Sequence, residues 1–143
     1  MTADADLAAL YQRGLREMAA KVRTDRRLVP ADISVTRTSR TCGSSVTIDI
    51  CRNGSLIGDL GWHTRACTLG MAATAAMVQG AVGQSFGAVE EIAGMLRSLL
   101  QGDDVPFPER WKTLEMFVAA RGFPSRHGSI MLPFDALAEA ART

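Results

Sequence analysis

The stretch VTIDICRNGSLIGDLGW, residues 46–62, predicts a β-hairpin at the centre of the fold. Its first part alternates apolar and polar residues, as in a strand that buries one face. The pair Asn53-Gly54 then separates this run from a second one, and Asn-Gly between such runs is a strong hairpin signal, because both residues accept positive φ. The residues expected on the shared buried face are Val46, Ile48, Ile50, Leu56, Leu60 and Trp62.

The same periodicities predict the rest of the chain. We expect a helix over about residues 5–22, a strand around Ile33–Thr36, and helices over about 69–77, 86–99 (with Ser85 as its N-cap), 111–117 and 130–142. Pro133 is expected in the first turn of the last helix, where its missing N–H is tolerated. The order predicts a single α+β domain spanning 1–143: an N-terminal helix, a three-stranded antiparallel sheet, then helices packed on one sheet face.

Composition excludes some function classes. The net charge of +1 gives no argument for binding nucleic acid. The first ten residues carry Asp4 and Asp6 and no basic region, and the longest weakly polar run, 67–82, contains Gln79 and is too short to span a membrane. We therefore expect a soluble, cytoplasmic protein. A basic cluster indicates either a solvated face or a docking patch for an acidic partner; its members are Lys21, Arg23, Arg26, Arg27, Arg37 and Arg40.

The cysteines are the main candidates for chemistry. Their odd number, Cys42, Cys51 and Cys67, argues against a disulfide framework and for a reducing compartment. Cys42 directly precedes the first hairpin strand and Cys67 follows the second, so the hairpin should bring both thiols to one end of the ladder. Cys67 also precedes a helix, whose positive N-terminal end favours a reactive thiolate. Cys51 is expected to be a small structural hydrophobe.

Other donors and reaction classes have weaker support. His63 and His127 are either third ligands beside the two thiols or solvated surface residues. Two cysteines alone are a weak zinc signal, because structural zinc takes four ligands and the chain has no Cys-x-x-Cys pair. The chain also has no Gly-Lys-Ser/Thr phosphate loop, no Gly-x-Ser-x-Gly elbow and no carboxylates paired for acid–base catalysis.

A series of motifs resembles one known family. Thr41-Cys42-Gly43-Ser44 resembles a Pro-x-Cys-Gly-Asp motif, and residues 62–77 resemble a Gly-Cys-Ala segment followed by a run of small residues. Residues 82–85 match a Lys-Gly-Lys-Ser/Thr turn, and residues 106–110 and 123–126 resemble the tail that leads to a third cysteine. The order resembles the U-type iron–sulfur cluster assembly scaffolds, IscU, SufU and the NifU N-terminal domain, with SufU closest.

The resemblance implies a site of three cysteines and an aspartate that holds a nascent iron–sulfur cluster or a zinc ion, with a cysteine desulfurase as partner. The family's third cysteine falls at Ser129 and its aspartate at Ser44, while two glycines fall at Thr64 and Ala66. Serine is a poor ligand for iron or zinc. Cys42 and Cys67 therefore remain the expected ligands, with Ser44, Ser129, His63 and His127 as weaker candidates, and stable binding of any cofactor stays open.

Three functions follow from this resemblance. The first is a non-enzymatic scaffold that receives sulfur from a cysteine desulfurase, with a cluster bridged between copies in a homo-oligomer as an open variant. The second is a relay like SufE, in which Cys67, with Cys42 as a second candidate, accepts a persulfide. The third is a regulatory paralogue that docks through its basic N-terminal region. None of them calls for nucleic acid or a membrane.

Overall fold

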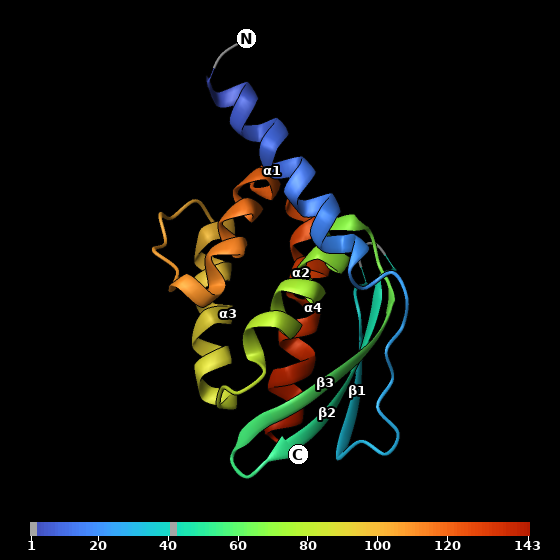
Figure 1. Ribbon diagram of the computed structural model, residues 1–143. Coiled ribbons are helices and arrows are strands. Elements are labelled where there is room, and N and C mark those ends of the chain that lie inside the picture. The colour runs from blue at the N-terminus through green and yellow to red at the C-terminus, as the bar shows by residue number, and fades with distance from the viewer. Residues whose placement is uncertain (1–2, 41–42) are drawn as a thin grey trace.

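The computed structural model describes residues 3–40 and 43–143, with side-chain burial given for 9–40 and 43–143. Its elements are α1 (Ala3–Ala20), β1 (Ile33–Thr38), β2 (Ser45–Asn53), β3 (Leu56–Arg65), α2 (Thr68–Ala81), α3 (Phe86–Leu100), the 3₁₀ helix η1 (Glu109–Ala120) and α4 (Pro124–Ala141). The strands form one antiparallel sheet in the order β1-β2-β3, with the helices on one side of it (Figure 1). This confirms the predicted α+β class and element order.

The central hairpin forms as predicted, with its turn one residue later. β2 and β3 pair from Ser45–Arg65 at one end to Asn53–Leu56 at the other. The loop is therefore Gly54 and Ser55, and the positive φ falls on Gly54, at 63°. Asn53 remains in the strand with a negative φ. A glycine in the first loop position is what a two-residue hairpin of this kind requires.

A bulge near the turn makes one predicted core residue wrong. Cys51 pairs with Asp59 and Arg52 pairs with Ile57, so Gly58 is an extra residue in β3. The insertion changes the phase of the first two residues of β3, so Ile57 is fully buried and Leu56 is 39% exposed. Leu60, beyond the bulge, is buried as expected. One extra residue moves the side chains between the bulge and the turn to the opposite sheet face.

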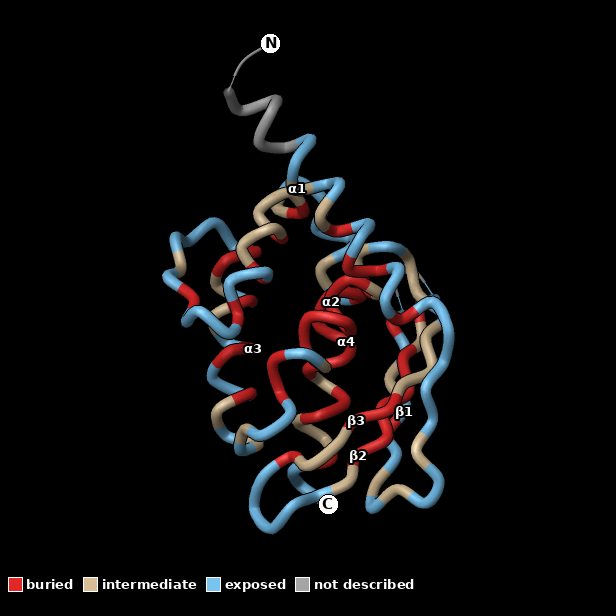
Figure 2. Tube along the Cα trace, in the orientation of Figure 1, coloured by how far each residue is buried: buried red, intermediate tan, exposed pale blue. Residues whose placement is uncertain are grey.

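The core lies between the sheet and the helices. Val46, Ile48 and Ile50 are fully buried on the face that α4 covers, and the central helices α2 and α4 are buried along much of their length (Figure 2). Each such aliphatic side chain contributes about 1.5–3 kcal/mol when it is removed from water. Buried alanines of α2, such as Ala72 and Ala76, let α1 and α4 approach it closely.

The helix predicted over about residues 111–117 is a 3₁₀ helix. Its buried residues are Trp111, Leu114, Phe117 and Ala120, each three positions after the last. A 3₁₀ helix has three residues per turn, so this spacing gives a single buried stripe. The interval of three was present in the sequence and distinguishes η1 from an α-helix, whose stripe would alternate steps of three and four.

The last helix begins earlier than predicted. α4 starts at Pro124, which occupies the first turn, where a missing N–H costs least. Pro133 lies in the helix interior, so its predicted place in the first turn was wrong. The prediction treated Pro124 as the end of the preceding helix instead of the start of this one. Pro133 has no N–H to donate to the carbonyl of Ser129, four residues earlier.

Residues 21–32, which we call the strap, run between α1 and β1 over the outer face of the sheet. The N–H of Arg26 donates to the Trp62 carbonyl at 3.0 Å, and the Trp62 N–H donates back to the Arg26 carbonyl at 2.6 Å. The Trp62 indole N–H donates to the carbonyl of Thr24 at 3.0 Å. A β-carbon on Gly61 would lie 2.4 Å from the Arg26 carbonyl oxygen, so the absence of a side chain there permits the strap to approach.

A buried carboxylate holds the strap. The Asp49 side chain on β2 is fully buried and accepts hydrogen bonds from Arg27 Nε at 2.7 Å, Arg27 Nη2 at 3.0 Å, the Leu28 N–H at 3.0 Å and Ser34 Oγ at 2.6 Å. Burial by itself would raise the pKa of Asp49. The hydrogen bonds from Arg27, Ser34 and Leu28 outweigh it and lower the pKa to about 2.

This clamp should make stability sensitive to acid. The pKa of Asp49 lies below its ordinary value of 3.8, so its contribution is complete above that pH and is lost as the pH falls through about 2. We expect Asp49→Asn to lower the free energy of unfolding at pH 7 by about 2 kcal/mol and to flatten the loss of stability below pH 4. Urea denaturation from pH 2 to 7 measures both. The exposed Asp104→Asn is the control, and an unchanged acid slope in Asp49→Asn would contradict the assignment.

α2 and α4 are in close contact at Gly70. A β-carbon built there would lie 2.9 Å from the β-carbon of Ala66, 3.4 Å from the carbonyl oxygen of Ser129 and 3.6 Å from its β-carbon. The distance of 2.9 Å is too short for two carbon atoms that are not bonded. The β-carbon of Ala66 and the backbone of Ser129 cannot move aside as the end of a long side chain could. The small residue at 70 therefore sets how closely the start of α2 approaches α4.

Gly70→Ala should be destabilising although alanine favours helices. We expect a loss of about 1–3 kcal/mol from overpacking, measured by urea denaturation. Gly94→Ala in α3 is the matched control. Apart from the backbone of its own helix and its chain neighbours, no atom lies within 4 Å of a β-carbon added at this position. It should gain about 0.5–1 kcal/mol from helix propensity. Equal effects at the two positions would reject the close-packing account.

Candidate functional site

The hairpin register defines the end of the sheet where the predicted site lies. Ser45, the first residue of β2, pairs with Arg65, the last residue of β3. The segment before Ser45 and the segment after Arg65 therefore leave the sheet side by side. Cys67 belongs to the second segment, while Cys42, in the first, lies outside the described residues. The meeting of the two thiols thus stays a prediction, which this register supports.

Cys67 is the N-cap residue of α2, as its predicted place before a helix requires. Its backbone is extended, with φ −66° and ψ 170°, and its carbonyl accepts the N–H of Met71 at 2.9 Å. The thiol is free and half-buried, and it does not cap the first turn of the helix. The sulfur therefore remains available for chemistry at the positive end of α2.

Ser129 lies next to the Cys67 segment. It is fully buried in α4, and its carbonyl oxygen and β-carbon lie beside Gly70, which also lies against Ala66, the residue before Cys67. The position that corresponds to the family's third cysteine is therefore at the start of α2, although α4 is more than 50 residues later in the chain.

Ser44 reaches the same region through the loop between β1 and β2. It is 4% exposed, and its carbonyl accepts the N–H of Ser39 at 2.8 Å. The hydroxyl of Ser39 in turn lies beside Gly128, 3.4 Å from where a β-carbon there would stand. Ser44, Cys67 and Ser129 thus occupy neighbouring segments at one end of the molecule. Within the described residues, no three His, Cys, Asp or Glu side chains are grouped so that they could hold a metal ion.

The two histidines are held by other partners. His63 lies on β3 opposite Thr47, and its Nδ1 is 2.5 Å from Oδ2 of Asp25 in the strap. His127 Nε2–H donates to the carbonyl of Ala120 at 2.9 Å, and its ring lines a cavity of about 330 Å³ with Arg97 and Asp135. Both ring orientations are accounted for by these contacts, so neither ring needs a metal to explain its position. Their roles as ligands stay predictions.

Thr64, where the resemblance places a glycine, ties down the approach to Cys67. Its hydroxyl donates to the carbonyl of Val22 at 3.3 Å, linking the end of β3 to the strap. A glycine has no side chain to make this bond. The segment that carries Cys67 is therefore fixed on one side by the strap and on the other by the Gly70 contact with α4.

Cys51 is half-buried on the outer face of β2, and its thiol is 3.6 Å from the Pro30 carbonyl. It therefore lies on the sheet face opposite Ile48 and Ile50, as its phase in the strand predicted. Its contact is with the strap, away from the sheet end that carries Cys67. This position agrees with a structural role, although the side chain is less buried than expected.

The basic cluster is divided by the fold. Arg26 pairs with Asp59 at 3.1 Å, Arg27 with Asp49 at 2.7 Å and Arg37 with Glu139 at 3.0 Å. These three arginines hold the strap and α4 to the sheet. The remaining members, Lys21, Arg23 and Arg40, are exposed and form no ion pair with any described carboxylate. The sequence showed the basic cluster but not its acidic partners, because these are 22 to 102 residues away in the chain.

The described helices include none that is long and apolar enough to cross a membrane.

Comparison with known proteins finds similar solved structures. No protein-family model and no curated protein matches it. Among solved structures, a nitrogen-fixing NifU-like protein (N-terminal) from Brucella abortus is 26% identical, with a TM-score of 0.85 and 92% of each chain covered. A protein of Fervidobacterium islandicum AW-1, described as an iron–sulfur cluster assembly scaffold for the SUF system, has the same fold at 17% identity, with a TM-score of 0.80, covering 88% of this chain and 92% of that one. These similarities agree with the predicted resemblance: the chain has the fold of a NifU-like N-terminal domain and of a SUF-system scaffold protein.

Proposed function

We propose that this protein is a scaffold-type component of iron–sulfur cluster assembly, in which Cys42 and Cys67 hold iron or a nascent cluster and receive sulfur from a cysteine desulfurase. The observation that carries the proposal is the convergence of Ser44, Cys67 and Ser129 at one end of the sheet. These are three of the four positions at which the resemblance places ligands. Free thiols of this kind belong in a reducing compartment, which in our proposal is the cytoplasm.

The donor set favours a transient cargo over a resident zinc ion. A closed structural zinc site needs four strong donors, usually thiolates and imidazoles. Ser44 and Ser129 have replaced two of them with hydroxyls, which bind soft metals poorly. Two thiolates of one chain leave ligand positions open on any cluster they hold. We propose that those positions are filled from outside the chain, by small thiols or by a second copy in a homo-oligomer.

Anaerobic reconstitution with ferrous iron and sulfide tests this function. We expect visible cluster absorbance and iron at stoichiometric level in the wild type, and loss of both in Cys67→Ser and in Cys42→Ser. Cys51→Ser is the matched control and should reconstitute normally, because its thiol faces the strap.

Ser129→Cys provides a gain-of-function variant in the same experiment. A third thiolate should raise the fraction of cluster that survives a fixed exposure to an iron chelator, because Ser129 lies beside the Cys67 segment. The absence of cluster absorbance together with no bound iron or zinc in the wild type would sink the proposed function.

A persulfide relay is the second candidate, and the state of Cys67 favours it. The thiol is half-buried, free and placed at a helix N-terminus without serving as a cap. With a cysteine desulfurase and cysteine, we expect a mass increase of one sulfur atom on Cys67 by peptide mass spectrometry. The adduct should persist in Cys51→Ser and disappear in Cys67→Ser; an unchanged adduct in Cys67→Ser would assign the acceptor elsewhere.

A further inference from the structure

The groove between α3 and α4 holds a charged pair that belongs neither to the clamp on the strap nor to the Cys67 end of the sheet. α3 packs beside α4. Two cavities, of about 330 Å³ and about 280 Å³, open between these helices, and both are lined by Arg97 of α3 and Asp135 of α4. The two charged side chains are therefore presented to any small molecule that enters either cavity.

The two cavities are the two halves of one groove between antiparallel helices. The larger one is lined by the C-terminal end of α3, at Leu100, and by the early turns of α4, at His127 and Met131. The smaller one is lined by earlier turns of α3 and later turns of α4. The ion pair between Arg97 and Asp135 crosses the groove where these halves meet.

The carboxylate of Asp135 is weakly paired. Its Oδ1 lies 3.5 Å from Nη2 of Arg97, at the outer limit of hydrogen-bond distance, and this is its one ion pair within the described residues. Burial, the largest effect, raises the pKa of Asp135 above its ordinary value of 3.8, although the charges of Arg97, Arg37 and Arg142 oppose the rise. The carboxylate has thus lost water without gaining a strong partner, and a cationic group of a ligand would supply one.

The guanidinium of Arg97 provides the opposite charge. Its side chain is 53% exposed and that of Asp135 is 33% exposed, so both groups can be reached from solvent. Its ion pair with Asp135 leaves most of its five N–H donors for another acceptor. Because a planar guanidinium binds carboxylates through two parallel hydrogen bonds, the groove has a place for a carboxylate beside a place for an ammonium group.

The spacing of these charges favours an α-amino acid. The ammonium and carboxylate groups of an α-amino acid are attached to one carbon atom, so they lie about as near each other as the charges of Arg97 and Asp135 do. The buried side chains of Leu100 and Met131 give the larger cavity an apolar floor next to this pair. Its volume of about 330 Å³ is at the lower end of the range for small-molecule sites and leaves room for an aliphatic side chain.

We propose that the groove between α3 and α4 binds a free α-amino acid with an aliphatic side chain. Arg97 holds its carboxylate, Asp135 holds its ammonium group, and its side chain lies over Leu100 and Met131. This site is on the side of α4 that faces α3, whereas Ser129 lies against α2. The proposal goes beyond the iron–sulfur function and does not depend on it.

Titration of the isotope-labelled protein with L-leucine, followed by NMR, tests the proposal. We expect saturable shifts of the amide signals of residues 97–101 and 127–132, with a Kd of about 1 mM or lower. Isocaproate, which is leucine without its amino group, and isoamylamine, which is leucine without its carboxylate, should each bind at least about tenfold more weakly, because one charge-assisted contact is lost. Glycine should bind about tenfold more weakly as well, because it has no side chain to bury on Leu100 and Met131.

Substitutions at the charged pair test the assigned roles. Arg97→Gln and Asp135→Asn should each weaken the binding of leucine at least about tenfold. Both side chains are partly exposed, so the variants should keep the fold, which circular dichroism checks.

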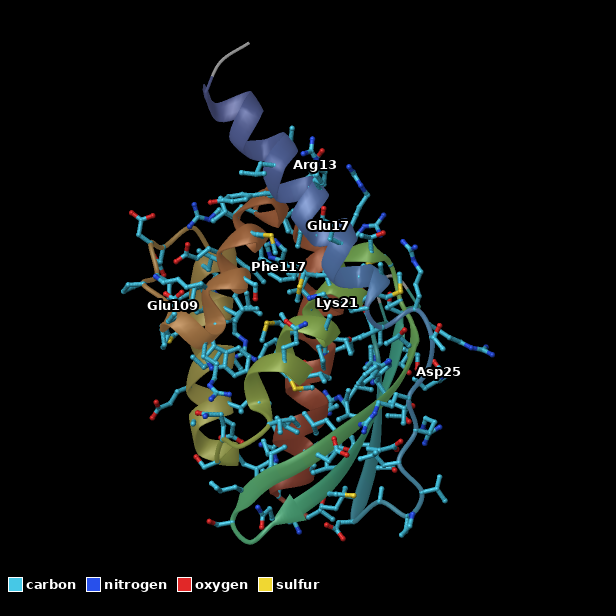
Figure 3. The ribbon with its side chains drawn as sticks, viewed as in Figure 1. Arg13, Glu17, Lys21, Asp25, Glu109 and Phe117 are labelled. Atoms are coloured by element: carbon cyan, nitrogen blue, oxygen red, sulfur yellow. The ribbon has the colours of Figure 1, made fainter. Side chains whose placement is uncertain are left out.

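The matched control removes a different ion pair of similar exposure. Lys112 and Glu115 are 3.2 Å apart on η1, the helix on which Phe117 is labelled in Figure 3. The variant Lys112→Gln/Glu115→Gln should bind leucine like the wild type. Weakening in this control equal to that in Arg97→Gln and Asp135→Asn would show that binding does not use the pair in the groove.

Three further results would overturn the proposal. One is the absence of saturable shifts with leucine at about ten times the expected Kd. Another is binding of isocaproate, isoamylamine or glycine as tight as that of leucine, and the third is unchanged binding in Arg97→Gln and Asp135→Asn. The titration needs no iron or sulfide, so its failure leaves the proposed scaffold function standing, and failure of cluster reconstitution leaves this site standing.

Discussion

The register between β2 and β3 is the constraint on which the rest of this structure depends. Pairing Ser45 with Arg65 places Ile48 and Ile50 toward the helices and Asp49 toward the strap. A shift by one residue would exchange these faces, burying a carboxylate in the apolar core and exposing the isoleucines. The same register puts the chain before Ser45 beside the chain after Arg65. The core, the clamp on the strap and the candidate site thus share one cause.

The strap is held in place by a buried charged group on the sheet. The carboxylate of Asp49 is fully buried, and each of its hydrogen bonds ties down a segment that has little apolar surface of its own. A buried charge is costly without partners, so the strap and β1 must both be in place before Asp49 is satisfied. Once docked, the strap reaches Thr64 through Val22 and so supports the segment that leads to Cys67.

The candidate site combines the fold of the structural neighbours with serines at two positions where the resemblance places ligands. The chain has the architecture of the iron–sulfur scaffold proteins to which it is similar, and it brings the corresponding positions together. Where the resemblance places a cysteine and an aspartate this chain has Ser129 and Ser44, and residues 39–47, 64–77 and 124–134 contain no Asp or Glu. Each change lowers the affinity for a bare cation.

The sequence by itself determined the element types, the hairpin and the segment that carries Cys67, because these follow from local periodicity and turn chemistry. Through the resemblance it also predicted that two ligand positions of the family are occupied by Ser44 and Ser129. Only the tertiary structure decided that Asp49 is the partner of Arg27, that Gly58 forms a bulge, and that Ser129 lies beside Gly70. These contacts join residues far apart in the chain, and no local pattern encodes such a pairing. The start of α4 belongs with them, since a proline can end one helix or begin the next, and packing against the sheet selects between the two.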